Sequence, residues 1–384
     1  TGKIHEEEEA VNSVGGQIHF TNEITFSSTT LINNHFDVYP EEAKNFLKDF
    51  RGKYSSSEII SMLQDLKGMK VLVIGDTIID EYHYCKPLGK SPKELLIPAR
   101  YLYDETFAGG ILAVANHVAG FCDEVHLVTC LGAQGTYENF ITNHLSPNIQ
   151  PKFFYWPGCP TIVKRRFVEA DLFRKMFEVC FMGSETLPPK VDGELCSYLR
   201  SIIGNYDMVM VADYGHGFIT EDIIDVLCHG SHFLAVNVQT NSANIGFNLI
   251  TKYDRADFVC LDEIEIRLAM HDNLRPVEDL LVRVTGELGC HRLIVTRGHL
   301  GSLVYANQDG GFYPIPVFSR DAVDRMGAGD AYFAITSPCV AAQFPPEVVG
   351  FIGNAVGALK IRIVGNRSPV EPLPLFKYIA TLLK

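Results

Sequence analysis

Closely spaced cysteines and long apolar runs are absent from this sequence. Its ten cysteines are scattered, and the two nearest in sequence are Cys122 and Cys130. The chain therefore has no C-x-x-C pair of the kind found in redox or zinc sites. No apolar run approaches the roughly 18 residues that span a bilayer. Cysteines such as Cys180 and Cys260, which lie in apolar runs, predict reduced core residues of a cytoplasmic protein with no membrane partner.

Positive charge is also scarce. The formal net charge is −13 at pH 7, which argues against a nucleic-acid partner, because such proteins present a basic face. An anionic substrate can still be bound by a local basic cluster. The sequence lacks a G-x-x-x-x-G-K-[ST] phosphate loop and a G-x-S-x-G elbow, so P-loop NTPases and α/β-hydrolases are poorly supported. It also lacks the H-x-G-H type of motif that nucleotidyl transfer would need.

The first 68 residues differ from the rest of the chain. They contain the acidic run Glu6-Glu7-Glu8-Glu9 and two helix starts, at Tyr39-Pro40-Glu41-Glu42 and at Ser55-Ser56-Ser57-Glu58, with Pro or acids in the first turn. We interpret residues 1–68 as an N-terminal appendage or linker, with residues 1–20 either ordered or a partly disordered arm. Because the chain does not begin with Met, we expect a fragment of a longer polypeptide.

From Met69 the pattern changes to alternating strands and helices. Residues 70–75 form a continuous apolar segment that ends at a Gly, as expected for a buried parallel strand. We therefore predict an α/β fold for residues 69–384, with a doubly wound, mainly parallel sheet and helices on both faces. Ligands of such sheets bind beyond the carboxyl ends of the strands. Further strand-like segments lie at residues 125–131, 208–212, 233–238, 258–261 and 293–296.

Two segments interrupt this alternation. Residues 82–108 and residues 160–181 contain short β-like runs separated by Gly, Pro and charged residues. Strands inserted into an α/β core predict a small β-lid over the ligand pocket. Lids of this kind close over substrates and exclude water during transfer reactions.

The most informative stretch is DRMGAGDAYFA, at residues 324–334. A Gly-rich turn that leads into a helix leaves backbone N–H groups free beside the positive end of the helix dipole, which favours a phosphoryl group there. We expect the N–H groups of Gly327, Ala328 and Gly329 to stabilise developing charge. Asp330 would lie in the first helical turn as the catalytic base of phosphoryl transfer. The alternative is an Asp that only caps the helix after a tight turn.

This stretch resembles the D-T-x-G-A-G-D signature of the ribokinase-like (PfkB) carbohydrate kinases. Three further matches follow the order of that family's motifs: its first strand at residues 75–80, its Gly-Gly pair at residues 109–110 and its nucleotide turn at residues 296–301. The resemblance covers residues 69–384 and implies a ribokinase-like fold that uses ATP. The residues that it assigns to the sugar are Asp76, Asp80, Gly109 and Gly110. Those that it assigns to the nucleotide are Thr296, Gly298, Gly301 and Asn354.

Within this family, the sequence is most similar to the kinase domain of bifunctional ADP-heptose synthases, which phosphorylates heptose 7-phosphate. The similarity lies in residues 75–82, in lid residues 91–98 and in residues 212–217, which resemble a D-Y-x-x-G turn. It implies substrate contacts from Asp213 and His216, a homodimer formed through the lid and fusion to a nucleotidyltransferase domain. For His216 the alternative is a turn histidine that bonds to the backbone.

The N-x-x-E motif, which the family uses for metal and phosphates, is present here as Asp262-Glu263-Ile264-Glu265. The resemblance implies that Mg²⁺ binds through Glu265 and water, which suits an ion that keeps several waters and uses few carboxylates. It also allows a monovalent cation such as K⁺.

A basic cluster lies within the second lid segment. It comprises Lys164-Arg165-Arg166 together with Arg174 and Lys175. We expect Lys164 and Arg166 to bind a substrate phosphate. The alternative is a solvated strand face whose charges pair with Glu169 and Asp171.

We therefore expect transfer of the γ-phosphoryl group of ATP to a hydroxyl of a sugar or sugar phosphate, such as heptose 7-phosphate. Three positions depart from the family pattern: Ala113 replaces an Asn after the Gly-Gly pair, Gln239 replaces a Lys, and Met326 replaces a Thr. These departures favour the alternative, which is a catalytically weak kinase fold that serves as a sugar or nucleotide sensor or as a scaffold for a fused domain.

Overall fold

The computed structural model describes residues 39–183, 186–308 and 310–384. Tyr39–Leu383 form one compact unit. The acidic run and the arm expected near the N-terminus lie outside the described residues. Within the described part of the chain, every helix is too short or too polar to cross a membrane.

The centre of this unit is a nine-stranded sheet with the order β13-β12-β11-β10-β9-β8-β1-β4-β5. The strands from β5 to β11 pair in parallel, whereas β12 and β13 complete one edge as antiparallel strands. The apolar segments of β1, β8 and β9 are almost entirely buried, as their sequences predict. The strands are β1 (Lys70–Gly75), β4 (Glu124–Gln134), β5 (Ile149–Pro160), β8 (Met208–Asp213), β9 (Leu234–Val238), β10 (Phe258–Asp262), β11 (Arg292–Thr296), β12 (Ser302–Ala306) and β13 (Gly311–Ile315).

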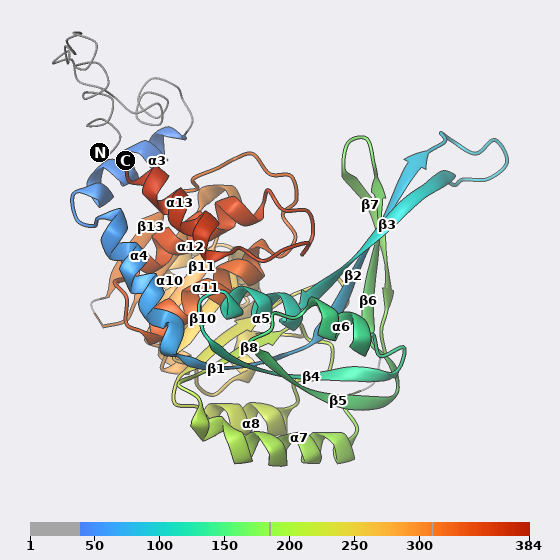
Figure 1. Cartoon of the computed structure of the whole chain (residues 1–384), viewed down its shortest axis with the longest axis horizontal. Coiled ribbons are helices and arrows are strands. Elements are labelled where there is room, and N and C mark those ends of the chain that lie inside the picture. Colours follow the sequence, from blue (N-terminus) through green and yellow to red (C-terminus); the bar gives the residue numbers. More distant parts are fainter. Residues whose placement is uncertain (1–38, 184–185, 309) are drawn as a thin grey trace, which may run out of the picture. The chain divides into compact units, whose positions relative to one another are not determined.

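Helices cover both faces of this sheet (Figure 1). Alternate residues of β1 belong to different hydrophobic clusters, with Val71 and Val73 on one face and Leu72 and Ile74 on the other, because successive side chains of a strand point to opposite faces. The first face is covered by α3 (Glu41–Arg51), α4 (Ser56–Asp65), α5 (Ile111–Ala119), α6 (Glu138–His144), α11 (Ala328–Ala341), α12 (Pro346–Lys360) and α13 (Pro372–Leu382). The second is covered by α7 (Pro189–Ile202), α8 (Glu221–Gly230), α9 (Glu263–Ala269) and α10 (Val277–Leu288). The predicted doubly wound α/β fold is confirmed.

Helices α3 and α4 belong to the same compact unit as the sheet. Their sequences are amphipathic, and their apolar faces are buried in the cluster that also contains α12 and α13. The ring of Phe50 stacks on that of Phe351 with centroids 4.5 Å apart. Helix α4 begins with a capping box of Ser55 and Glu58, which satisfies two N–H groups of its first turn. The domain boundary expected after residue 68 therefore lies inside the compact unit, which begins at Tyr39.

A second, four-stranded sheet has the order β3-β2-β6-β7. It projects away from the larger sheet (Figure 1). Its strands are β2 (Thr77–Pro87), β3 (Ala99–Gly110), β6 (Ile162–Glu169) and β7 (Arg174–Phe181). Residues 82–108 thus form the greater part of two long antiparallel strands instead of the several short runs expected. The cause is that β2 pairs on both sides, with β3 and with β6, so its polar residues do not interrupt it.

Whether Cys180 and Cys260 are buried depends on the sheet in which each of them lies. Cys260 lies in β10 of the larger sheet and is buried, as predicted. Cys180 is exposed, which contradicts the expectation that it lies in the core. It belongs to β7, which is an edge strand of the smaller sheet and is exposed along most of its length.

A buried histidine makes the stability of this fold depend on pH. His117 of α5 is 2% exposed, and its Nδ1 accepts a hydrogen bond of 3.0 Å from the N–H of Val370, so this nitrogen must be unprotonated. Burial, together with the charge of Lys360, lowers the pKa of His117 to about 3. The unfolded chain takes up this proton near pH 6.5. The stabilisation is therefore complete above pH 6.5 and is lost as the pH falls from 6.5 to 3.

We predict that His117→Asn removes this part of the pH dependence, because the Oδ1 of Asn can accept the same hydrogen bond without titrating. Between pH 7 and pH 5 the wild type should lose about 2 kcal/mol of unfolding free energy more than the variant. Urea unfolding of both proteins at the two pH values measures this difference. Equal losses in the two proteins would contradict the assignment.

Candidate active site

The glycine-rich turn forms the start of α11, as the sequence predicts. Gly327 caps the helix with φ 71° and ψ 10°, a left-handed conformation that favours glycine. A Cβ at this position would lie 2.5 Å from Oδ1 of Asn366. The N–H of Ala328 donates to the carbonyl of Arg325 at 3.3 Å. Of the three amides expected to bind a phosphoryl group, that of Ala328 therefore bonds within the turn.

Asp330 lies in the first turn of α11 and is only 9% exposed. Its Oδ1 accepts hydrogen bonds from the hydroxyl of Tyr214 at 2.9 Å and from Nε2 of Gln239 at 2.6 Å. Burial raises the pKa of Asp330, although these two hydrogen bonds lower it in part. Both donors hold the same oxygen, so the carboxylate is oriented. Neither contact is predicted by the sequence, although the turn of Tyr214 and the position of Gln239 both stand out in it.

Two further carboxylates, Asp76 and Asp213, lie at the carboxyl ends of β1 and β8. The Oδ2 of Asp76 accepts the N–H of Tyr214 at 3.0 Å, and burial, followed by the charge of Asp213, raises the pKa of Asp76 to about 7. Its buried Oδ1 has no hydrogen-bond partner among the described residues. Asp213 is already paired, since it accepts hydrogen bonds from the hydroxyl of Tyr253 and forms an ion pair of 2.5 Å with Lys252.

Asp80 of β2 lies against the glycine pair at the start of α5. A Cβ at Gly109 would lie 2.1 Å from Oδ2 of Asp80, and a Cβ at Gly110 would lie 2.6 Å from the carbonyl oxygen of Asp76. These close approaches explain why glycine is needed at both positions. Asp80 also forms an ion pair with Arg166 of β6. The structure therefore brings together Asp76, Asp80 and the glycine pair, the residues that the resemblance assigns to the sugar.

The basic cluster of the second sheet divides into paired and unpaired side chains. Arg166 pairs with Glu178 at 2.7 Å in addition to Asp80, and Arg165 pairs with Glu81 at 2.6 Å. These partners differ from the two acids that the sequence suggested. Among the described residues no hydrogen bond or ion pair of Lys164 is found, but its charge contributes to the lowered pKa of His216 and acts against the raised pKa of Asp76.

His216 lies in the turn after β8. Burial, together with the charge of Lys164, lowers the pKa of His216 to about 4, so the imidazole is neutral at pH 7. Its Nε2 is buried without a partner in the described part of the chain. His216 and Asp76 line a small cavity of about 30 Å³. A larger cavity of about 420 Å³ adjoins α5 and is lined by Ala113 and Asn366. Asp330 lines neither of these two cavities.

The residues expected at the nucleotide meet near the end of β13. Asn354 of α12 donates to the carbonyl oxygens of Ile315 at 2.8 Å and Pro316 at 2.9 Å. Gly301 has φ 90°, and a Cβ there would lie 2.0 Å from the carbonyl oxygen of Ile315. Both residues thus fix this end of β13. Gly298 opens the turn after β11 with φ 53°, and Thr296 donates to the carbonyl oxygen of Leu261 at 3.4 Å.

Both carboxylate oxygens of Glu265 accept hydrogen bonds at the start of α9. Its Oε2 accepts the N–H of Asp262 at 2.7 Å in a capping box, and its Oε1 accepts the N–H of Thr240 at 3.1 Å. Burial, followed by the charge of Asp262, raises the pKa of Glu265 to about 8. The described residues contain no group of three or more His, Cys, Asp or Glu side chains that could hold a metal. A single carboxylate suits only an ion such as Mg²⁺, which takes its other ligands from water and phosphates.

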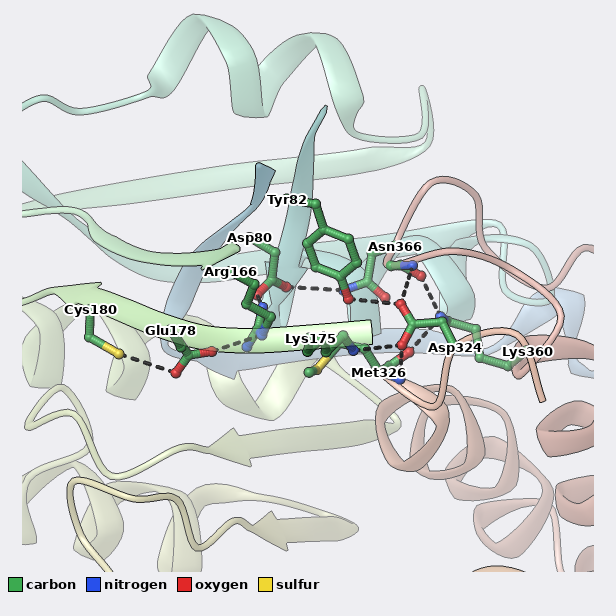
Figure 2. Close-up of polar contacts among 11 residues, drawn as sticks. Asp80, Tyr82, Arg166, Lys175, Glu178, Cys180, Asp324, Met326, Lys360 and Asn366 are labelled. Atoms are coloured by element: carbon green, nitrogen blue, oxygen red, sulfur yellow. Dashed lines mark hydrogen bonds and ion pairs between the residues drawn. The ribbon is translucent and has the colours of Figure 1, made fainter. Parts of the chain in front are cut away.

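Asp324 joins the second sheet to the glycine-rich turn (Figure 2). Its Oδ1 accepts from Nζ of Lys175 at 2.7 Å, and its Oδ2 accepts from the hydroxyl of Tyr82 at 2.8 Å. The N–H groups of Met326 and Gly365 donate to the same carboxylate at 3.1 and 2.8 Å. Burial acts to raise the pKa of Asp324, but the hydrogen bonds, that of Lys175 first, outweigh it and hold the pKa below its ordinary value. The sequence analysis did not foresee this link.

The fold and the site together define a doubly wound α/β protein in which carboxylates gather around a glycine-rich helix start. A model of the family described as "pfkB family carbohydrate kinase" matches residues 69–372. The chain therefore belongs to the pfkB family of carbohydrate kinases.

Individual relatives are distant. The "Bifunctional protein HldE" of Koribacter versatilis is 25% identical over 331 residues, which are 83% of this chain and 66% of that protein. The chain thus spans slightly less than two thirds of this relative. Among solved structures, an Arabidopsis thaliana ribokinase complexed with ribose and ATP has a TM-score of 0.60 at 15% identity, covering 81% of this chain and 99% of that one. Phosphofructokinase-2 of Escherichia coli in complex with potassium has a TM-score of 0.65 at 15% identity, covering 82% and 100%.

We predict that Lys175→Met destabilises the protein, because it leaves the carboxylate of Asp324 buried without its cation. The expected loss is about 2 kcal/mol of unfolding free energy. Lys164→Met is the matched control, since it removes a lysine of the same sheet for which the described residues show no ion pair, and it should change stability by less than about 0.5 kcal/mol. Urea unfolding measures both values, and equal losses would show that the link to Asp324 contributes nothing.

Proposed function

We propose that this chain transfers the γ-phosphoryl group of ATP to a hydroxyl of a sugar or sugar phosphate, with heptose 7-phosphate as the first substrate to examine. Membership of a carbohydrate kinase family supports the reaction class. Likeness to a ribokinase that binds ribose and ATP and to HldE proteins supports the choice of substrates. The name of these relatives, bifunctional protein, also supports the proposal that a nucleotidyltransferase domain accompanies the kinase.

The orientation of Asp330 is the observation that carries this proposal. Tyr214 and Gln239 both hold its Oδ1, and among the described residues no hydrogen bond reaches Oδ2. In the proposed reaction Oδ2 takes the proton of the attacking hydroxyl, a bond forms between the sugar oxygen and the γ-phosphorus, and the bond from that phosphorus to the β-phosphate oxygen breaks to release ADP. The raised pKa of Asp330 favours this role, because a general base works best when its pKa lies near the working pH.

The start of α11 would stabilise the transferred group. The amides of Gly327 and Gly329 make no hydrogen bond among the described residues, whereas that of Ala328 is engaged in the turn. The helix dipole adds positive potential at the same place. When bound, Mg²⁺ would neutralise charge on the phosphates, and Glu265 would contact it through water. The nucleotide itself would lie beside residues 296–301 and α12.

The sugar would lie between β2 and α5. The buried Oδ1 of Asp76 has no partner in the described part of the chain, and an unpaired buried acceptor is destabilising, so a donating sugar hydroxyl would relieve it. Lys164 provides the charge for a substrate phosphate, because the described residues show no ion pair for it or for Arg174, whereas the other three side chains of the basic cluster are paired. Asp330 is almost buried, so the proposal includes a movement that opens access to it, and the second sheet would move as a lid.

We predict that Asp330→Asn abolishes turnover while it preserves the fold and ATP binding. The amide has nearly the same shape but cannot take a proton, so the rate should fall by about 10³-fold or more. Release of ADP in the presence of Mg²⁺ and a panel of sugars and sugar phosphates measures the rate, and isothermal titration measures ATP binding. Asp225→Asn, on the exposed side of α8, is the control and should leave the rate unchanged.

Turnover by Asp330→Asn at the wild-type rate would contradict the assignment of the base. A wild-type protein that binds ATP and a sugar but releases no ADP with any substrate would instead support a binding sensor or a scaffold.

We predict that Lys164→Met raises the KM for a sugar phosphate about tenfold and leaves the KM for the corresponding unphosphorylated sugar unchanged, because one charged hydrogen bond to a phosphate contributes about 1.5 kcal/mol. Steady-state kinetics with the two substrates provide the measurement and its internal control. An equal change of both KM values would exclude a contact between Lys164 and the phosphate.

A further inference from the structure

Lys360 is a buried cation that contacts the glycine-rich turn and lies beside Asp324 (Figure 2). It lies in the last turn of α12, and its side chain is 0% exposed. Its Nζ donates to the carbonyl oxygen of Met326 at 2.8 Å and to that of Gly365 at 2.6 Å. A lysine at a helix C-terminus often bonds the last carbonyls of its own helix, but these two oxygens belong to other segments.

The surroundings keep this amine charged. Burial lowers the pKa of Lys360 to about 8, while the carboxylates of Asp324, Asp330 and Asp80 act in the opposite direction. At pH 7 the group is therefore mainly an ammonium ion. Placing a charge in the interior is costly unless it is bonded and balanced, and here both conditions are met by carbonyl oxygens and nearby carboxylates.

Met326 and Gly365 are held in the same way from two sides. The N–H of each residue donates to the carboxylate of Asp324, and the carbonyl oxygen of each accepts from Lys360. The carbonyl of Met326 and the N–H of Gly327 belong to one planar, trans peptide, so they point in opposite directions. Fixing the carbonyl oxygen on Lys360 therefore directs the N–H of Gly327 away from Lys360, toward the side where the phosphoryl group would lie.

We propose that Lys360 is a positioning residue whose ammonium group holds the turn at residues 324–327, in the place where a loose monovalent cation would otherwise be bound. Rings of carbonyl oxygens are the ligands that replace the hydration shell of K⁺, and an ammonium group can use the same oxygens as acceptors. The side chain also fills the space, since its Cε lies 3.4 Å from where a Cβ of Gly327 would be. The residues therefore do not fit a bound K⁺, and the chain does not require one. This inference rests on the proposed kinase function for its catalytic consequence, but not for its structural one.

The structural consequence is tested by thermal unfolding of the chain in NaCl, KCl and NH₄Cl at one ionic strength, without substrate. The melting temperature of the wild type should differ by less than about 1 °C between the three salts. Lys360→Ala should melt lower in NaCl and should regain about 2 °C or more in KCl or NH₄Cl, because an ion that binds only the folded state stabilises it. Lys360→Met should melt lower without regaining stability, since its side chain still fills the space but carries no charge.

The catalytic consequence is tested in the same salts by ADP release with ATP, Mg²⁺ and whichever sugar or sugar phosphate the wild type accepts. Wild-type turnover should be equal in the three salts. The turnover rate of Lys360→Ala should be about 100-fold lower than that of the wild type, the effect expected for a small misplacement of a catalytic group. NH₄Cl or KCl should raise the rate of this variant about tenfold.

The outcomes separate this inference from the proposed function. A wild type that is stabilised or activated by K⁺ over Na⁺ would overturn the role of Lys360, and this result needs no variant to fold. A Lys360→Ala protein that folds but shows no response to K⁺ or NH₄⁺ would overturn it as well. A wild type without turnover on any substrate would contradict the kinase function, while the melting temperatures would still decide whether Lys360 replaces a cation.

Discussion

The site depends on two opposite charges, Asp324 and Lys360, that hold the same two peptide segments. The anion binds the N–H groups of Met326 and Gly365, and the cation binds their carbonyl oxygens. A left-handed Gly327 between such fixed groups has little freedom to turn its peptides. Preorganised amides are effective because they need no reorganisation when charge develops. The same carboxylate also receives Lys175 and Tyr82, so the position of the second sheet is coupled to the turn.

Three buried carboxylates of the site each lie beside a cation. Asp213 has Lys252, Asp80 has Arg166, and Asp324 has Lys175. Ion pairs of this kind contribute little net stability when both charges must be desolvated, but removing one partner leaves an uncompensated charge. Asp76, like Asp330, has no ion pair among the described residues, and burial, followed by the charge of Asp213, raises the pKa of Asp76 to about 7. Its unpaired oxygen is therefore a place where a ligand can supply what the protein does not.

Sequence patterns predicted those features that depend on neighbouring residues. The buried strands follow from continuous apolar runs, and the positions of Gly327 and Asp330 follow from a turn that enters a helix. Pairings across long separations were beyond such patterns. Lys360 reaches Met326 across 34 residues, and Lys175 reaches Asp324 across 149, so only the folded chain brings them together. Helices α3 and α4 were predicted near their observed starts. Their packing on α12 was not predicted, because sequence periodicity identifies the apolar face of a helix but not the surface against which that face packs.

The contacts of Met326, Gln239 and Ala113 show that the three departures from the family pattern have different effects. At residue 326 the contacts come from the backbone, whose N–H binds Asp324 and whose carbonyl oxygen binds Lys360, so Met in place of Thr leaves the turn intact. Gln239 donates to Oδ1 of Asp330, a neutral hydrogen bond that orients the proposed base and lowers its pKa only in part. Ala113 lines the larger cavity beside α5, where a shorter side chain enlarges the space. Two of the three changes thus preserve or tune the proposed chemistry, and the third alters the shape offered to a substrate, which is what a kinase of altered specificity requires.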